Sequence, residues 1–227
     1  MQIIDALGLP SAQARIADFD GQRALVVERF DRCWTNDQWL LRLPQEDCRQ
    51  ALSIPPPRKY ESEGGPSIVD ILEFLKGSDD PAEDQTLFIK AQIVFWLMAA
   101  TDGHAKNFSV FLHPGGGFRI TPLYDVMSTQ PLFDAGQLRR NQVRFAMAVG
   151  DNRHYRVHDI MPRHFAQTVA KAGIHQAAIS DIVQEFRSQM PLAINNVCNA
   201  LPADFPNALR DSITGGIEER LRRLATQ

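Results

Sequence analysis

Three oxygen-bearing side chains of this 227-residue chain stand at spacings that suit phosphoryl transfer. Asp102 and Asn107 are separated by four residues, and Asp125 follows Asn107 by eighteen. A protein-kinase catalytic loop has the same spacing: its Asp orients or deprotonates the attacking hydroxyl, its Asn holds magnesium, and a further Asp supplies another metal contact. The pattern therefore predicts a site for transfer of a phosphoryl group to a hydroxyl.

The segment between Asn107 and Asp125 predicts how these side chains meet. Phe108–His113 and Phe118–Pro122 have the pattern of two short strands joined by Pro-Gly-Gly-Gly, which indicates a hairpin. Antiparallel strands lie ~5 Å apart and return the chain to the same end. Asp102 lies on the loop that leads into this end, so we predict that all three side chains converge there.

Each polar residue of this region has a predicted role. Asp125 would chelate magnesium and Asn107 would hold it from the other side, because magnesium prefers oxygen ligands when phosphates complete its shell. Asp102 would face the incoming hydroxyl, and Lys106 would stabilise charge on the transferred group. Either Asp alone would fit a turn or cap residue. His104 remains open between a contact to nucleotide phosphate and a hydrogen bond within a tight loop.

Val27–Asp31 is a second candidate segment. A buried strand that runs into charged residues resembles a hinge between two lobes, where backbone N–H and C=O groups can bind an adenine edge. A plain strand end remains the alternative. Glu218–Leu224 carries mixed charge on a predicted helix, which favours a solvated face over a nucleic-acid or partner contact.

The remaining pattern indicates an α+β fold with a small β-rich start and a mainly helical remainder. Met1–Leu9 has the pattern of a helix tail, and Thr86–Ala100 is apolar on nearly all faces, as a central buried helix would be. The predicted strands of the first part are Arg15–Asp18, Arg23–Asp31 and Trp39–Leu43, the last pairing back onto the strand before it. The other predicted helices are Ile68–Lys76, Arg163–Lys171, His175–Ala200 with a break or kink at Pro191, and Pro206–Ala225 weakened by Gly215-Gly216.

Composition excludes several classes of protein. The net charge of -3 argues against a generally basic nucleic-acid binder, and 44% hydrophobic with 22% charged residues is ordinary for a globular chain. Three widely spaced cysteines form neither a zinc motif nor a complete disulfide set, so reduced thiols are expected. We find no signal peptide and no apolar run of ~20 residues, so we expect a cytoplasmic location and no membrane association.

Longer strings around these residues resemble the HipA family of serine/threonine kinase toxins. They are Val26–Arg32, Leu41–Asp47, Lys59–Pro66, Ala100–Ser109, Tyr124-Asp125, Pro162–Phe165 and Leu201–Pro206. The similarity runs along essentially the whole chain but covers only about the second half of a full-length family member. The resemblance implies a two-lobed fold like that of protein kinases and phosphatidylinositol kinases. Residues 1–45 would then be a remnant of the nucleotide lobe with hinge strands, and residues 46–227 the mainly helical C-terminal kinase domain.

The resemblance also implies an activity, ligands and partners. It implies a type II toxin–antitoxin pair in which a toxin that needs ATP and Mg²⁺ phosphorylates a translation target such as glutamyl-tRNA synthetase. A HipB-like helix-turn-helix antitoxin would hold the toxin and bind operator DNA. By motif position Asp102 would be catalytic, and Asn107 and Asp125 would bind metal. The nucleotide-binding residues would be Glu28, Arg29, Phe30, His104, Ala105, Lys106, Asn107, Tyr124, Asp125, Val126 and Met127, with Glu28 and Phe30 binding adenine through their backbone.

Two features of the family cannot be located in this sequence. Its phosphate-binding loop and its nucleotide-binding lysine lie upstream of the matched region. Without them we expect weak or absent ATP binding and kinase activity from this polypeptide alone. The alternative function is a catalytically incomplete module that binds the antitoxin or its operator complex.

Overall fold

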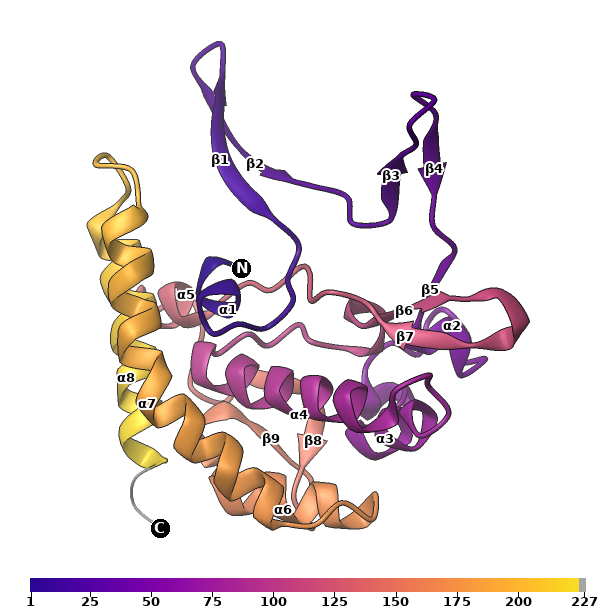
Figure 1. Cartoon of the computed structure of the whole chain (residues 1–227). Helices are drawn as coiled ribbons and strands as arrows, with labels where there is room; N and C mark the ends of the chain where they lie inside the picture. The colour runs from indigo at the N-terminus through magenta and orange to yellow at the C-terminus, as the bar shows by residue number, and fades with distance from the viewer. Residues whose placement is uncertain (225–227) are drawn as a thin grey trace.

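The computed structural model describes residues 1–224 and shows an α+β fold that is mainly helical (Figure 1). The α-helices are α1 (Gln2–Ala6), α2 (Cys48–Ala51), α3 (Ile68–Leu75), α4 (Pro81–Met98), α5 (Gln130–Asp134), α6 (Pro162–Lys171), α7 (Ala177–Ala200) and α8 (Asn207–Arg223). The strands are β1 (Ala14–Phe19), β2 (Gln22–Val27), β3 (Arg32–Trp34), β4 (Leu40–Arg42), β5 (Gln45–Asp47), β6 (Ser109–Leu112), β7 (Phe118–Ile120), β8 (Arg144–Val149) and β9 (His154–Arg156). Short 3-10 turns are η1 (Glu61–Glu63), η2 (Ala105–Asn107), η3 (Pro114–Gly116) and η4 (Val157–Asp159). All described strand pairs are antiparallel: β1–β2, β3–β4, β5–β6–β7 and β8–β9.

Helix α4 runs through the centre of the molecule, between the β5–β6–β7 sheet and the β8–β9 hairpin (Figure 1). It begins where the Asp80 carboxylate accepts a hydrogen bond from the Glu83 N–H and Pro81 occupies the first turn. Its second half is buried on every face, and Trp96 also donates its indole N–H to the Val157 carbonyl at 3.0 Å. The predicted central helix is therefore confirmed, with an earlier start than expected.

The last helices close the core around α4. Helix α7 continues through Pro191 without the predicted break, since this proline is exposed and water can satisfy the carbonyl that it leaves unpaired. Helix α8 continues through Gly215-Gly216, and Gly216 has a packing reason: a Cβ there would lie 2.6 Å from the Gln130 side chain. The predicted end of α8 at Ala225 lies outside the described residues.

Buried Arg220 joins three of these helices. Its side chain is 1% exposed, donates from Nε to the Leu97 carbonyl of α4 at 2.8 Å and from Nη1 to Gln130 Oε1 of α5 at 2.9 Å. Burial lowers the pKa of this guanidinium to about 10, so it stays charged at neutral pH. The end of α8 is thus fastened to the end of the central helix.

The first strands form two hairpins that project from the helical body (Figure 1). Their large apolar side chains face solvent: Ile16, Phe19, Leu25, Val27, Trp34, Trp39, Leu40 and Leu41. The predicted strand Arg23–Asp31 is wrong in its second half, because the chain leaves the strand after Val27 and turns around a buried Asp31. The next strand, Leu40–Arg42, pairs with Arg32–Trp34 rather than with β2.

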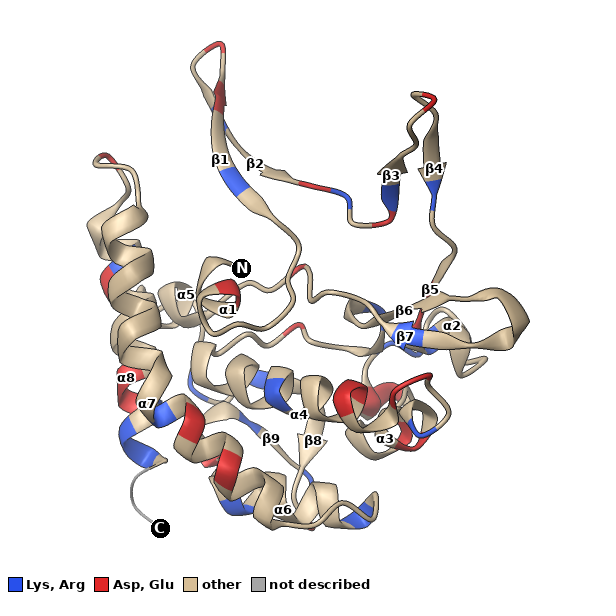
Figure 2. Ribbon diagram, viewed as in Figure 1, with Lys and Arg blue, Asp and Glu red and all other residues tan. Residues whose placement is uncertain are grey.

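The charged residues at the start of α4 and at the end of α8 suit the helix dipoles (Figure 2). Glu83 and Asp84 lie in the first turn of α4, and Arg220, Arg222 and Arg223 lie in the last turn of α8. Each sign of charge faces the helix end that stabilises it. Within residues 1–224, no helix combines the length and apolar character needed to cross a membrane.

Candidate active site

The loop that carries Asp102 starts where α4 ends. Ala99 adopts a left-handed conformation with φ 49°, and the Ala100 N–H donates to the Phe95 carbonyl, which closes the helix. Gly103 then passes directly over the Phe95 ring, where a Cβ would lie 2.5 Å from a ring carbon. Only glycine fits at this approach, so the core aromatic ring sets the path of the Asp102 loop.

Asn107 and Asp125 meet at the open end of the β6–β7 hairpin, as the sequence predicts. Asn107 Nδ2 donates to Asp125 Oδ2 at 2.9 Å. Asn107 is 4% exposed and its Oδ1 has no hydrogen-bond partner within residues 1–224, whereas Asp125 is exposed. An acceptor oxygen that is buried without a partner costs free energy, so Asn107 Oδ1 beside a carboxylate is suited to receive a cation.

The backbone around Asp125 is strained. Asp125 has φ 55°, a left-handed conformation that costs a non-glycine residue about 1–2 kcal/mol. Leu123, two residues before it, donates to the Pro10 carbonyl and accepts from the Ala12 N–H, which ties this segment to the N-terminal part of the chain. Tyr124 adds a second anchor, since its hydroxyl donates to the Lys106 carbonyl at 2.8 Å and contacts Ser109 Oγ at 2.6 Å.

Asp102 lies apart from this pair in its direct contacts. It makes no hydrogen bond with Asn107 or Asp125 in the described part of the chain; instead its Oδ1 accepts from the Tyr60 hydroxyl at 2.7 Å. His104 Nε2 lies 3.8 Å from the same oxygen. Burial lowers the pKa of His104, so the ring is neutral at neutral pH. Two roles were predicted for His104, a contact to nucleotide phosphate and a hydrogen bond within a tight loop. The residue is 5% exposed and enclosed within the loop, although its Nδ1 has no partner among residues 1–224.

The predicted hinge segment lies against the hairpin. The Phe30 ring packs on Tyr124 with centroids 5.6 Å apart and on Phe111 at 5.8 Å. The Glu28 N–H already donates to the Gln13 carbonyl, whereas no backbone group among residues 1–224 engages the Phe30 N–H. Arg29 instead forms a two-point ion pair with Asp31, with both N–O distances 2.7 Å.

The buried Asp31 carboxyl contributes to stability in a pH-dependent way. It is 1% exposed, and hydrogen bonds from Arg29 lower the pKa of its carboxyl from 3.8 to about 2. Because the pKa of Asp31 is lower in the folded than in the unfolded chain, its ionised form stabilises the fold at pH values above the unfolded pKa. This stabilisation is lost as the pH falls from about 4 to about 2. We therefore expect Asp31→Asn to flatten acid unfolding in that range, as measured by circular dichroism. An unchanged acid transition in Asp31→Asn would contradict this.

The other predicted nucleotide-binding residues, which flank Asn107 and Asp125 in the sequence, differ in exposure. Lys106 is exposed, Ala105 is fully buried, Val126 is half-buried and Met127 is 71% exposed. Burial raises the pKa of Tyr124 to about 12, so its hydroxyl remains a donor. Among residues 1–224 no cluster of three or more His, Cys, Asp or Glu can hold a metal ion. The Asn107–Asp125 pair nevertheless fits magnesium, which binds through one or two protein oxygens when substrate phosphates complete its shell.

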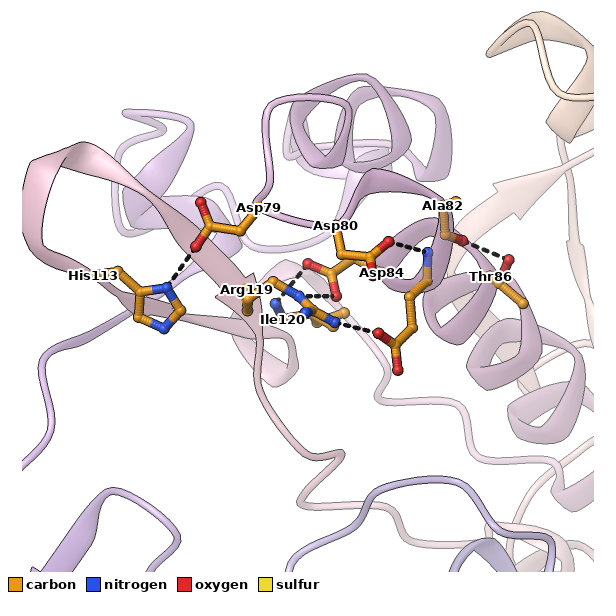
Figure 3. A network of polar contacts seen from close by, with 9 residues as sticks. Asp79, Asp80, Ala82, Asp84, Thr86, His113, Arg119 and Ile120 are labelled. Atoms are coloured by element: carbon orange, nitrogen blue, oxygen red, sulfur yellow. Dashed lines mark hydrogen bonds and ion pairs between the residues drawn. The ribbon is translucent and has the colours of Figure 1, made fainter.

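A buried carboxylate fastens the hairpin to α4 (Figure 3). Asp84, 1% exposed, accepts from Arg119 Nε at 2.9 Å and from the Ile120 N–H at 3.0 Å. Glu83 binds the same guanidinium from the solvent side at 2.7 Å. Sequence analysis missed both this clamp and Tyr60. A pair 35 positions apart leaves no local spacing signal, although Lys59–Pro66 was among the strings that carried the family resemblance.

The fold is that of a known class of kinases. A solved complex of Shewanella oneidensis HipA, HipB and operator DNA contains a chain that superposes with a TM-score of 0.85 at 24% identity, covering 99% of this chain and 53% of that one. The Helicobacter pylori proinflammatory kinase CtkA gives a TM-score of 0.62 at 11% identity, with 97% and 80% covered.

Residues 1–194 match the family described as the HipA-like C-terminal domain, and the chain belongs to that family. Curated relatives include the serine/threonine-protein kinase toxin HipA of Shewanella oneidensis, 27% identical over 89% of this chain and 47% of that protein. The putative kinase Y4mE of Sinorhizobium fredii is 41% identical over 57% of this chain and 31% of that protein. The chain thus matches about a third to a half of the length of these two relatives.

Proposed function

We propose that this chain is the catalytic part of a HipA-like serine/threonine kinase toxin of a type II toxin–antitoxin system. The observation that carries the proposal is the pairing of Asn107 with the strained Asp125, which leaves a buried oxygen without a partner beside a carboxylate. Kinship with proteins named as kinases supports the reaction class. The family resemblance extends the proposal to a translation target such as glutamyl-tRNA synthetase.

Each side chain has a task in this reaction. Magnesium and ATP, when bound, would supply the phosphoryl group and neutralise its charge. Asn107 and Asp125 would hold the metal, and the exposed Lys106 ammonium would stabilise charge on the phosphate oxygens. Asp102 would accept the proton of the substrate hydroxyl.

The hinge and the hairpin would hold the nucleotide base. Phe30 and Tyr124 supply an aromatic wall, and the free N–H of Phe30 supplies a donor for an adenine edge. The Glu28 backbone would contribute only its carbonyl, because its N–H is already bonded. Arg29 would contact the nucleotide only if its pair with Asp31 opens.

The proposed partners follow from the structural neighbour. Since that HipA is solved with HipB and operator DNA, we propose that this chain binds a helix-turn-helix antitoxin and, through it, operator DNA in the cytoplasm.

The exposed apolar side chains of the β1–β2 and β3–β4 hairpins favour a second candidate, a binding module that assembles with another polypeptide. This candidate also agrees with the sequence, because a glycine-rich loop and a strand lysine for the phosphates are not found among these 227 residues.

Replacement of Asp125 tests the nucleotide site. We expect the chain to bind ATP more weakly than micromolar and only with magnesium, and Asp125→Ala to weaken that binding at least about tenfold by removing a metal ligand. Titration of a fluorescent ATP analogue, with nuclear magnetic resonance for weak affinities, measures both effects. Asp151→Ala is the control, because Asp151 is exposed and pairs with Lys171 away from the site. Equal affinity with and without magnesium would contradict the proposed metal site, and micromolar affinity would contradict the expected weakness.

A further inference from the structure

Tyr60 lies against Asp102 although Asp102 comes 42 positions later in the sequence. Its hydroxyl donates to Asp102 Oδ1 at 2.7 Å, and its ring meets the His104 ring edge to face, with centroids 5.1 Å apart. Lys59 Nζ lies 4.8 Å from the centroid of the Tyr60 ring. The string Lys59–Pro66, to which the proposed function gives no task, therefore reaches the Asp102 loop.

The backbone after Tyr60 is folded tightly enough to fix the side chain. Gly64 has φ 86°, and the Gly65 N–H donates to the Tyr60 carbonyl at 2.9 Å. A Cβ on Gly65 would lie 2.7 Å from the Arg58 carbonyl oxygen and 2.8 Å from that of Tyr60, so no side chain fits there. The two glycines allow a closed turn that an ordinary sequence would not form.

A second anchor holds the turn to the body of the protein. The Glu61 carboxylate accepts a hydrogen bond from the Ala148 N–H of β8 at 2.5 Å and pairs with Arg153 at 3.1 Å. Burial raises the pKa of the Glu61 carboxyl, an effect that these partners oppose. Glu61, the residue after Tyr60, thus ties the turn that carries Tyr60 to strand β8.

The two oxygens of Asp102 are left in different states. Oδ1 receives the Tyr60 hydroxyl and lies near His104, whereas Oδ2 has no hydrogen bond within residues 1–224. The Asp102 side chain is 54% exposed, so a substrate hydroxyl can approach it from solvent. A carboxylate fixed through one oxygen presents the other in a defined direction.

We propose that Tyr60 is a positioning residue that holds Asp102 through Oδ1 and directs Oδ2 at the hydroxyl to be phosphorylated. This inference rests on the proposed kinase function. As the substrate oxygen bonds the γ-phosphorus and ADP leaves, the hydroxyl proton passes to Oδ2, and Tyr60 keeps its own proton. Burial and the Asp102 carboxylate raise the pKa of Tyr60, which keeps its hydroxyl a donor throughout.

Tyr60→Phe removes the hydroxyl and keeps the ring, so it isolates the positioning contact. We expect kcat for transfer of labelled phosphate from ATP to acceptor proteins to fall about tenfold, less than the ~10²–10⁴ expected for the base itself, with KM for ATP unchanged. Ser188→Ala is the control: it loses an exposed hydroxyl on α7 that donates to the Glu185 carbonyl at 2.8 Å, outside the proposed site, and should keep full activity. Circular dichroism confirms that both variants fold.

A spectroscopic readout tests the contact independently of activity. With the three tyrosines labelled at the ring carbon that bears oxygen, the signal lost in Tyr60→Phe belongs to Tyr60. We expect its titration to move to lower pH in Asp102→Asn, because the carboxylate charge that raises its pKa is removed. An unmoved titration would overturn the contact.

The activity results separate the two proposals. Wild-type activity in Tyr60→Phe overturns the positioning role and leaves the kinase function standing. Increased activity in Tyr60→Phe also overturns it, because Tyr60 would then occupy the place of the substrate hydroxyl. Absence of transfer by the wild-type chain removes the kinase activity of this chain alone, and the titration of Tyr60 in Asp102→Asn then decides whether the positioning contact exists.

Discussion

Asp102→Asn is expected to lower phosphoryl transfer by about 10²–10⁴-fold, since the amide cannot accept the proton of the attacking hydroxyl. Asparagine has nearly the same shape and can still accept the Tyr60 hydrogen bond, so the loop should keep its fold. Transfer of labelled phosphate from ATP to bacterial proteins gives the rate, and growth after induced expression gives the effect in cells. Phosphate transfer and growth inhibition should both be lost, while binding to the antitoxin survives.

Asp181→Asn provides the control for Asp102→Asn, because it makes the same chemical change at an exposed position on α7. We expect it to be silent in both assays. If Asp102→Asn were also silent in cells, the binding-module function would explain the chain better than the kinase function. The comparison therefore separates the two candidate functions with one pair of variants.

Asp84→Ala is expected to lower the free energy of unfolding by about 2–4 kcal/mol. It removes two hydrogen bonds from a fully buried carboxylate and leaves the buried Ile120 N–H without a partner. The loss should not exceed this range, because the Arg119 side chain is 32% exposed and water can solvate it in the variant. Urea unfolding followed by circular dichroism measures the change.

Glu83 is the natural control for Asp84, since both carboxylates pair with Arg119 from the first turn of α4. The Glu83 side chain is 68% exposed, so Glu83→Ala should cost only about 0–1 kcal/mol. Equal losses in the two variants would show that burial of Asp84 is not what stabilises the hairpin. Because β7 leads to Asp125, Asp84→Ala should also weaken magnesium-dependent ATP binding.

Local patterns were sufficient to predict the elements that carry the candidate site. The apolar run before Ala100 predicted the central helix, and a Pro-Gly-Gly-Gly turn between two apolar segments predicted the β6–β7 hairpin. The contact between Asn107 and Asp125 followed from hairpin geometry alone. Their functional roles remain predictions, as does the division of the chain at residue 45.

Contacts between segments far apart in the sequence were not predictable in this way. No strand was predicted between residues 126 and 161, where β8 is buried along most of its length and lacks the alternation of a half-exposed strand. The pairing of Leu40–Arg42 with a three-residue strand was missed because so short a strand has no recognisable period. Tyr60 was missed for another reason, since only the folded turn at Gly64-Gly65 brings it to Asp102.

The link from Arg220 to the Leu97 carbonyl bears on where this protein can be divided for expression. The family match stops at residue 194, inside α7, yet Arg220 lies beyond that point and completes the end of the helix that leads to Asp102. A recombinant fragment cut at the limit of the family match would lose α8 and expose the part of α4 that α8 contacts. The unit that folds is therefore longer than the family match outlines, and the final helix belongs in any fragment meant to keep the site intact.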